Sequence, residues 1–233
     1  MNIKEAVVLA GGLGTRLRSV VNDMPKCMAI VNGKPFIYYV VKNLQDQGVN
    51  RFIFSLGYKH EVLEDYLKDF LKNFSVDFII ENEPLGTGGA IKKAYNYTTQ
   101  KNVIICNGDT LFKIDLKKLF KLHEEKNSEC TLSLKPMYKF DRYGVVKLSS
   151  TKKIISFQEK KYYVDGLING GFWLLNMKKF ISKSLPEKFS FEKDYLEKFY
   201  LNGDMFGIIC EDYFIDIGIP IDFERANKEI PNF

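Results

Sequence analysis

Cysteine and histidine are scarce in this sequence, and their positions argue against two broad kinds of site. The four cysteines are far apart and form no Cys-x-x-Cys pair, so neither a redox motif nor zinc chemistry is indicated. Cys106 and Cys210 lie in apolar, strand-like runs, where reduced and buried thiols are expected. His60 and His123 lie among charged residues on expected helices, with no serine nearby in a nucleophile turn. Hydrolysis by a Ser-His-Asp triad is therefore not indicated either.

Long hydrophobic runs and blocks of like charge are also missing. The apolar run near the N-terminus is too short for the hydrophobic part of a signal peptide, and no stretch is suited to span a membrane. The lysines behind the net charge of +5 are scattered in pairs, such as Lys92-Lys93 and Lys152-Lys153. Such pairs are typical of solvated faces. We expect a cytoplasmic protein that has neither a membrane nor a nucleic acid as its partner.

The first half of the chain alternates short apolar runs with amphipathic segments. The clearest helix places Leu63, Leu67 and Phe70 on one side. The expected strands cover 3–9, 51–56, 77–80 and 102–106, and the expected helices cover 36–44, 60–71 and 88–97. Short strands alternating with helices predict an α/β fold with a doubly wound, mostly parallel sheet.

Strands and turns dominate the second half. We expect a helix over 115–126, strands over 130–136, 144–148, 154–158 and 167–175, short helices over 177–183 and 191–201, a strand over 205–210 and a helix after Pro220. The segment 149–152 looks like a hairpin tip, so this half should form a smaller antiparallel lobe. With 233 residues, 45% of them hydrophobic, the chain suits one domain over 1–233.

A glycine-rich turn follows the first expected strand. Residues 9–18 spell Leu-Ala-Gly-Gly-Leu-Gly-Thr-Arg-Leu-Arg, and Pro25-Lys26 come shortly after. Glycines let the backbone approach phosphate oxygens, and the N–H groups thus freed form an anion-binding nest. Arg16 adds a planar, permanent charge and Lys26 a mobile point charge. We therefore expect this segment to hold a polyphosphate.

Three common phosphate-binding motifs do not fit this turn. A dinucleotide-binding G-x-G-x-x-G starting at Gly12 would have its third glycine at Leu17. A P-loop needs Gly-Lys-Ser/Thr, whereas Gly33-Lys34 is followed by Pro35. A kinase glycine loop lies between antiparallel strands, whereas this turn follows the first strand of an α/β pattern.

Asp109 and Asp216 occur in matching contexts. Each follows an apolar strand-like run and has a glycine beside it, in Asn107-Gly108-Asp109 and in the segment 214–218, Phe-Ile-Asp-Ile-Gly. Because ligands of open α/β sheets bind at the carboxyl ends of the strands, a carboxylate there is well placed to bind Mg²⁺. An ordinary Asp turn or helix cap is the alternative for either residue alone.

The combination G-G-x-G-T-R-L…P-K resembles the signature of the sugar-1-phosphate nucleotidyltransferases. The resemblance extends over nearly the whole chain and implies a Rossmann-like fold of the nucleotidyltransferase or GT-A type. It implies a nucleotide-binding half at about 1–112 and a sugar-binding half at about 113–233. Asp109 and Asp216 would together hold Mg²⁺ on the nucleotide phosphates. The implied catalytic residues are Arg16, Lys26, Asp109, Lys160 and Asp216.

The same resemblance implies residues for both substrates. The loop 83–90 would lie against base and ribose, where side chains would block the approach. Glu159 would accept hydrogen bonds from sugar hydroxyls and Lys160 would contact the sugar phosphate; an ordinary strand-end charge pair is the alternative. The residues assigned to the nucleotide are Leu9, Ala10, Gly11, Gly12, Gly14, Thr15, Arg16, Lys26, Gly86, Thr87, Gly88 and Asp109. Those assigned to the sugar are Asn107, Tyr143, Gly144, Glu159, Lys160, Asn169, Gly170 and Glu192.

One glutamate suggests which base would be bound. Guanine presents N1–H and its N2 amino group side by side, so one carboxylate can accept from both. Glu81 ends the strand that precedes the loop at Gly86, and we assign it to the nucleotide as well. A solvated strand-end glutamate is the alternative, and Glu83 is the second candidate.

Within the family, the segments 28–36 and 83–90 and the short chain look most like guanylyltransferases of D-glycero-α-D-manno-heptose 1-phosphate. The implied reaction joins GTP and this sugar 1-phosphate to give a GDP-sugar and pyrophosphate, for a bacterial capsule or surface glycan. The alternatives are mannose-1-phosphate guanylyltransferases and uridylyl- or thymidylyltransferases of this fold. From other classes, a GT-A glycosyltransferase and a non-catalytic regulator with a nucleotidyltransferase-like domain are alternatives. Either a monomer or a dimer is compatible with the sequence.

Overall fold

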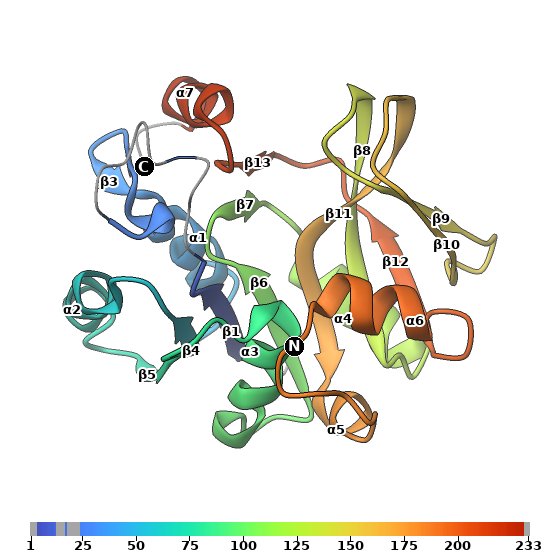
Figure 1. The fold of residues 1–233 in the computed structure, drawn as a ribbon, viewed down its shortest axis with the longest axis horizontal. Helices are drawn as coiled ribbons and strands as arrows, with labels where there is room; N and C mark the ends of the chain where they lie inside the picture. Colours follow the sequence, from blue (N-terminus) through green and yellow to red (C-terminus); the bar gives the residue numbers. More distant parts are fainter. Residues whose placement is uncertain (1–3, 13–16, 18–23, 231–233) are drawn as a thin grey trace.

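The computed structural model describes residues 4–12, 17 and 24–230, and a sheet of nine strands forms its centre (Figure 1). Four parallel strands stand side by side in the order β6-β1-β4-β5. They are β1 (Glu5–Ala10), β4 (Arg51–Leu56), β5 (Ser75–Ile80) and β6 (Asn102–Asn107). Parallel strands require crossover connections, and helices supply them here on both faces of the sheet. The doubly wound fold predicted from the sequence is therefore confirmed.

The sheet becomes antiparallel where β11 pairs with β6. The strands of this second part are β8 (Cys130–Phe140), β9 (Val145–Leu148), β10 (Ile154–Gln158), β11 (Tyr163–Asn176) and β12 (Met205–Ile209). They form the lobe on the right of Figure 1. β9 and β10 are a hairpin with its tip at 149–152, as expected, while β12 runs parallel to β8. Two short antiparallel pairs lie outside the main sheet: β2 (Ile30–Val31) with β3 (Lys34–Pro35), and β7 (Thr110–Phe112) with β13 (Phe214–Asp216).

Helices cover both faces of the sheet. The α-helices are α1 (Phe36–Gln45), α2 (His60–Phe70), α3 (Gly86–Ala94), α4 (Leu116–Glu125), α5 (Met177–Ile181), α6 (Glu197–Phe199) and α7 (Pro220–Glu229). The 3-10 helices η2 (Lys26–Met28) and η3 (Tyr95–Tyr97) and the π-helix η4 (Phe191–Leu196) complete the described elements. No helix among the described residues is long and apolar enough to cross a membrane.

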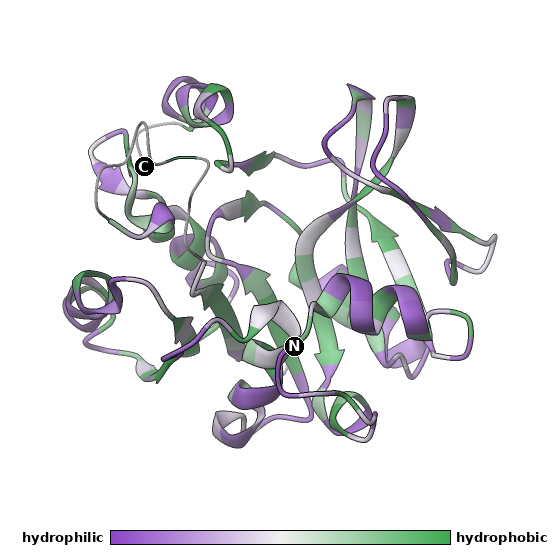
Figure 2. Ribbon diagram, in the orientation of Figure 1, coloured by the Kyte–Doolittle hydropathy of each residue, from purple (hydrophilic) through white to green (hydrophobic). Residues whose placement is uncertain are grey.

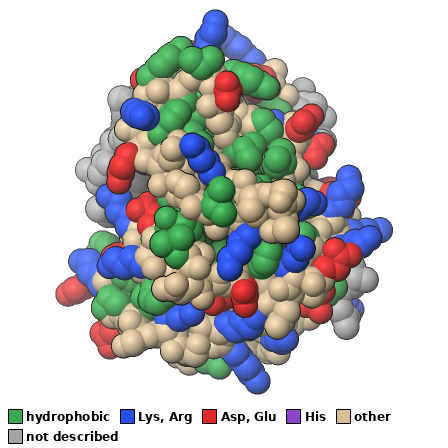
Figure 3. Space-filling view, turned by 90° about the vertical axis from the view of Figure 1, so that its right-hand side faces the viewer, with side chains coloured by type: hydrophobic (Ala, Val, Ile, Leu, Met, Phe, Trp, Pro, Cys, Tyr) green, Lys and Arg blue, Asp and Glu red, His purple; other side chains and the backbone are tan. Residues whose placement is uncertain are grey.

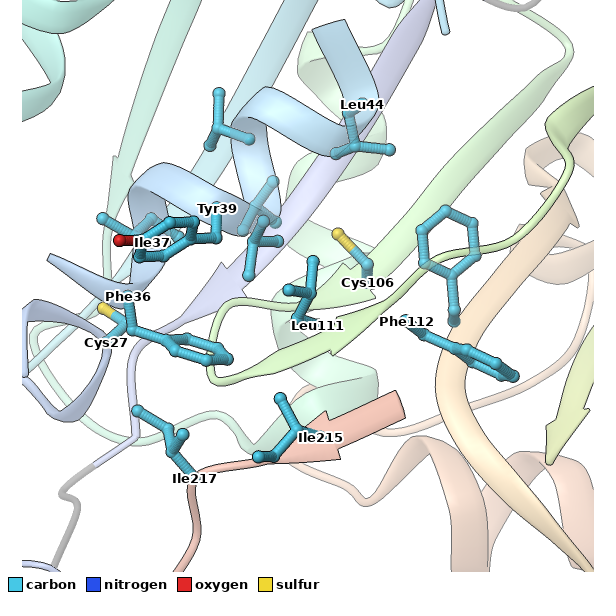
Figure 4. Packing of buried hydrophobic residues seen from close by; sticks show 14 of the residues in the cluster. Cys27, Phe36, Ile37, Tyr39, Leu44, Cys106, Leu111, Phe112, Ile215 and Ile217 are labelled. Atoms are coloured by element: carbon cyan, nitrogen blue, oxygen red, sulfur yellow. The ribbon is translucent and has the colours of Figure 1, made fainter. Parts of the chain in front are cut away.

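The core consists of two hydrophobic clusters on opposite faces of the sheet. Because side chains alternate along a strand, Ala6 and Val8 pack with α1 and α2, whereas Val7 packs with α3 and α5. Figure 2 shows hydrophobic residues concentrated in the strands. Figure 4 shows Leu111 of β7 and Ile215 of β13 within the α1 cluster. This packing fixes β7, which Asp109 directly precedes, and β13, which ends at Asp216.

Several elements differ from the expectation. β8 and β11 are longer than predicted, and the segment expected as a helix over 191–201 is a π-helix followed by one short α-helical turn. The strand β7 was not predicted at all. The four cysteines are free and buried, as expected for two of them. Burial raises the pKa of Cys106 to about 12, so its thiol is inert at neutral pH.

Candidate active site

Asp109 and Asp216 lie together because β7 pairs with β13. Asp109 lies in the turn after β6 and directly precedes β7, and β13 ends at Asp216, which stands opposite Thr110 in the antiparallel register. The backbone N–H of Ile217 donates to the carbonyl of Asp109 at 3.1 Å, which closes the pairing. The sequence predicted that both aspartates would meet at the carboxyl edge of the sheet, and the structure brings them there.

Lys26, the first residue of η2, reaches both aspartates with its side chain. Its Nζ donates to Asp109 Oδ2 at 2.6 Å and lies 3.5 Å from Asp216 Oδ1. Burial, and secondly the charge of Asp109, raise the pKa of Asp216. The opposing charges of Lys26 and Arg142 lower it. The site therefore gathers two carboxylates whose repulsion is relieved by a shared cation.

Arg142 and Tyr143 hold Asp216 from the antiparallel lobe. The Tyr143 hydroxyl donates to Asp216 Oδ2 at 3.2 Å, and Arg142 Nη2 lies 3.7 Å from the same oxygen. Arg142 also forms an ion pair with the buried Asp222 of α7. Sequence reasoning gave Arg142 no role, although its position directly before Tyr143 was a usable signal.

A cavity of about 450 Å³ opens beside the aspartates. Its lining includes many of the residues that the sequence assigned to the sugar or to catalysis. The lining residues are Lys26, Asn107, Asp109, Thr110, Asp141, Arg142, Tyr143, Lys160, Asn169, Gly170, Gly171, Glu192, Phe214 and Asp216. We call this space the central cavity.

An adjoining cavity of about 260 Å³ shares three of these residues, Lys160, Asn169 and Glu192. Gly144 and Glu159 line this adjoining cavity and not the central one. The residues that the sequence assigned to the sugar therefore surround two adjoining spaces.

The amide of Asn169 is fixed at the junction of the two cavities. Its Nδ2 donates to Glu192 Oε1 at 3.0 Å, and its Oδ1 accepts from the indole N–H of Trp173 at 2.9 Å. Because Trp173 is buried and has one donor, this bond sets which way the amide points. Burial raises the pKa of Glu192, and the nearby charge of Lys160 opposes this shift.

The start of the glycine turn packs against β4 and β5. A Cβ on Gly11 would lie 2.9 Å from Glu81 Oε1, and a Cβ on Gly57 would lie 2.6 Å from the Gly11 carbonyl. The N–H of Gly108 donates to the Leu9 carbonyl at 2.8 Å. The structure thus describes Leu9, Ala10, Gly11 and Gly12 of the predicted turn. Gly14, Thr15 and Arg16 lie outside the described residues.

Glu81 lines a third cavity, of about 360 Å³, together with Gly11, Gly57 and Tyr58. Its carboxylate is held on both sides: Oε1 accepts from Ser55 Oγ at 2.7 Å, and Oε2 accepts from the Leu85 N–H at 3.0 Å. A carboxylate oxygen can accept more than one hydrogen bond, so both oxygens keep capacity for a ligand. Glu83, the second candidate, is exposed and does not line this cavity.

The second glycine loop has a packing role that the sequence analysis missed. The resemblance explains its glycines by the approach of base and ribose. In the structure, a Cβ on Gly86 would lie 2.5 Å from the Phe189 carbonyl, and one on Gly88 would lie 2.1 Å from the Phe189 ring. The Thr87 hydroxyl accepts from the Phe191 N–H at 2.9 Å. The loop therefore ties α3 to η4 and so to Glu192.

The chemistry of the aspartate pair fits a hard divalent cation, which prefers carboxylate oxygens. The Lys26 ammonium lies between the two carboxylates, where such a cation would be held. Among the described residues, no group of three or more His, Cys, Asp or Glu side chains could hold a metal ion. A metal ion at this pair would therefore need further oxygens from water or from a ligand.

Comparison with known proteins places this arrangement in a family. The chain is 50% identical over 229 residues to the D-glycero-alpha-D-manno-heptose 1-phosphate guanylyltransferase of Aneurinibacillus thermoaerophilus, covering 98% of this chain and 99% of that protein. It is 45% identical to the enzyme of the same name from Campylobacter jejuni, covering 94% and 96%. The crystal structure of HddC from Yersinia pseudotuberculosis complexed with GMP-PN superposes with a TM-score of 0.88 at 42% identity, covering 98% and 100%.

The nucleotidyl transferase family model matches residues 5–232, which include every strand of the sheet and both aspartates. Nucleotidyltransferases of this family generally use a divalent metal ion. The chain belongs to the nucleotidyl transferase family.

Proposed function

We propose that the chain is a guanylyltransferase that joins GTP and D-glycero-α-D-manno-heptose 1-phosphate, giving a GDP-sugar and pyrophosphate. Two relatives of nearly full length carry this activity in their names, and HddC has been crystallised with GMP-PN. The observation that carries the proposal is the central cavity, where Lys26, Asp109 and Asp216 stand at one end and Lys160, Asn169 and Glu192 at the junction with the adjoining cavity. Such a cavity can bring the reacting phosphates of the two substrates together.

The reaction needs positioning and charge neutralisation more than proton transfer. An oxygen of the sugar phosphate attacks the α-phosphorus of GTP in line, and the bond to the bridging oxygen of the β-phosphate breaks as pyrophosphate leaves. A phosphate is already a nucleophile at neutral pH, so no general base is required. Lys26 and Lys160 would stabilise the charge on the transferring and attacking phosphates. Arg16, outside the described residues, is assigned the same role on the nucleotide side.

Asp109 and Asp216 would hold Mg²⁺ in this proposal. When bound, the ion neutralises charge on the triphosphate and makes pyrophosphate a better leaving group. Tyr143 and Arg142 keep the carboxylate of Asp216 oriented toward Asp109 through the contacts described above.

The remaining residues divide between the two substrates. We assign the nucleotide to the half formed by about 1–112, through Leu9, Ala10, Gly11, Gly12, Gly14, Thr15, Arg16, Lys26, Glu81, Gly86, Thr87, Gly88 and Asp109. We assign the sugar to the half formed by about 113–233, through Tyr143, Gly144, Glu159, Lys160, Asn169, Gly170 and Glu192. Asn107, from the first half, is also assigned to the sugar. We place the enzyme in the cytoplasm, where GTP is made, and in a pathway to a capsule or surface glycan.

A pyrophosphate-release screen tests the proposal. The four nucleoside triphosphates are each combined with heptose 1-phosphate, mannose 1-phosphate and glucose 1-phosphate in the presence of Mg²⁺. We expect the fastest release with GTP and heptose 1-phosphate. Faster release with mannose 1-phosphate would assign a different sugar, and release of free nucleoside diphosphate in place of pyrophosphate would indicate a glycosyltransferase.

A further inference from the structure

Lys26 occupies the position between the two carboxylates that a divalent cation would take. Its ammonium contacts both Asp109 and Asp216, and only 12% of its side chain is exposed. A Cβ on Gly218 would lie 3.3 Å from Nζ, so the backbone closes one side of the ammonium. An ion that binds both carboxylates must therefore displace this ammonium.

The charges around the two carboxylates also weaken their electrostatic attraction for a free divalent cation. Three carboxylates, Asp109, Asp216 and Asp222, are paired here with three cations, Lys26, Arg142 and Arg225. The formal charge of this group is close to zero, so a free divalent ion gains little Coulombic attraction on approach. Desolvating the ion would be poorly compensated as long as Lys26 stays in place.

The described part of the chain offers this site no third acidic, thiol or imidazole ligand. Two carboxylates alone leave most positions of an octahedral ion to water or to a ligand. Triphosphate oxygens can fill such positions and can at the same time attract the Lys26 ammonium away from Asp109.

We propose that Lys26 closes the carboxylate pair of the free enzyme to divalent ions, and that the ion enters only together with the nucleoside triphosphate. This inference rests on the proposed function, because it assumes that the pair holds the ion during the reaction. Lys26 then has two successive partners: the carboxylates before substrate binds, and the phosphates afterwards. The lysine thereby prevents unproductive binding of metal to the free enzyme.

The test measures Mn²⁺ binding to the free protein without nucleotide, through the electron paramagnetic resonance signal of unbound Mn²⁺. Lys26→Met removes the charge and keeps a side chain of similar length. We expect this variant to bind Mn²⁺ about tenfold or more tightly than the wild type, because the ion no longer displaces a charged hydrogen-bond partner. Lys26→Gln serves as a second variant if the methionine variant does not fold.

Two further variants control the measurement. Lys160→Met removes a charge from the same cavity, but that charge acts on Glu192, so its Mn²⁺ affinity should stay at the wild-type value. Adding Asp109→Asn to Lys26→Met should abolish the gain.

Equal affinities of the wild type and both Lys26 variants would overturn the inference. A gain of the same size in Lys160→Met would also overturn it, because the effect would then reflect net charge alone. Since no substrate is present, these outcomes are independent of the pyrophosphate-release screen that tests the proposed function.

Discussion

At the scale of single residues, Glu81 shows how the structure sharpens an expectation about base recognition. Its carboxylate is held by Ser55 and by the backbone of Leu85, and it faces a cavity beside Gly11. A held carboxylate loses little side-chain entropy when a ligand binds. Uracil would present carbonyl oxygens to it on either side of its N–H, whereas guanine presents two donors.

We predict that Glu81→Gln lowers the preference for GTP over UTP by about tenfold or more, because a charge-assisted hydrogen-bond pair is worth roughly 1.5–3 kcal/mol. The measurement is the ratio of kcat/KM for the two nucleotides, which is insensitive to a general loss of activity. Glu83→Gln, at an exposed position of the same loop, should leave the ratio unchanged. An unchanged ratio in Glu81→Gln would assign base recognition to other groups.

The two aspartates give a second prediction at this scale. Asp109→Ala or Asp216→Ala should lower the rate of pyrophosphate release roughly a thousandfold, since losing a metal anchor costs on the order of 4 kcal/mol of transition-state stabilisation. The exposed Asp65 on α2 provides the control, because Asp65→Ala should retain full activity. Turnover near the wild-type level in either site variant, at the same Mg²⁺ concentration, would remove that residue from the proposed metal site.

Lys26, Asp109 and Asp216 could be proposed as site residues from the sequence because each stands in a local motif, and the structure brings the three side chains together. Arg142 has no such motif. Its position beside Asp216 depends on an ion pair with Asp222 in α7, 80 residues further along the chain. Contacts between distant elements of this kind leave no periodic signal in the sequence.

At the scale of elements, the structure explains the second glycine loop by helix packing. Alanine favours a helix interior over glycine by about 1 kcal/mol, so Gly88→Ala would be stabilising if α3 were isolated. Here a Cβ at Gly88 would collide with the ring of Phe189, which is itself buried. The collision is expected to outweigh the gain in helix propensity.

We therefore predict that Gly88→Ala lowers the free energy of unfolding by about 1–3 kcal/mol, the usual cost of overpacking. Urea unfolding measures it. In the double variant with Phe189→Ala, the loss should be smaller than the sum of the single losses, because the clash is gone. A more stable Gly88→Ala protein would show that the loop moves freely away from Phe189.

β7 and the π-helix η4 could not be predicted from local sequence, for a common reason. β7 has three residues, and its pairing partner β13 lies far along the chain. The π-helix η4 packs its aromatic side chains onto the core, with the ring centroids of Phe191 and Trp173 5.0 Å apart. Both conformations depend on tertiary contacts, whereas the long helices and parallel strands follow from their own periodicity.

A buried histidine on α4 makes stability depend on pH. His123 Nδ1 is hydrogen-bonded to Thr131 Oγ1 of β8 at 2.9 Å, and burial lowers the pKa of His123 to about 4. In the unfolded chain the ring takes up a proton below about pH 6.5. Between these two values protons bind preferentially to the unfolded state. The stability that depends on the neutral ring is therefore complete above pH 6.5 and is lost as the pH falls toward 4.

We predict that this effect costs the wild type about 3 kcal/mol of unfolding free energy between pH 6.5 and 4, at 1.36 kcal/mol per unit of pKa difference. The variant His123→Gln carries no titrating ring, so its unfolding free energy should fall by correspondingly less between pH 6.5 and 4. Urea unfolding of both proteins at several pH values isolates the contribution, because the carboxylates are common to both. If the unfolding free energies of the two proteins changed with pH to the same extent, His123 would not be a neutral, buried ring.

At the scale of the whole molecule, the charges form no block of one sign on the face that Figure 3 shows. Basic and acidic side chains are interspersed there with apolar ones. This distribution agrees with the lysine pairs scattered along the sequence. It offers no basic patch on this face of the kind that binds nucleic acid, in line with a proposal that includes no nucleic-acid partner. The mild excess of positive charge suits two anionic substrates.

The two proposed halves share one framework. β11 of the second half pairs with β6 of the first, with Phe172 opposite Cys106, and β13 pairs with β7. Both hydrophobic clusters also draw on both halves: one contains Ile215, and the other contains Trp173. A fragment of residues 1–112 would expose β6 as an unpaired edge and would lose the side chains that cover it.

We therefore predict that the protein unfolds in one cooperative step despite its two substrate-binding halves. Trp173 is the single tryptophan and is buried in the second half, so its fluorescence reports on that half. Far-UV circular dichroism includes the helices of both halves. In urea, the two signals should change with the same midpoint and the same slope, and the fragment 1–112 should be unfolded on its own. Separate midpoints, or a folded fragment, would show that the halves are independent folding units joined only at the active site.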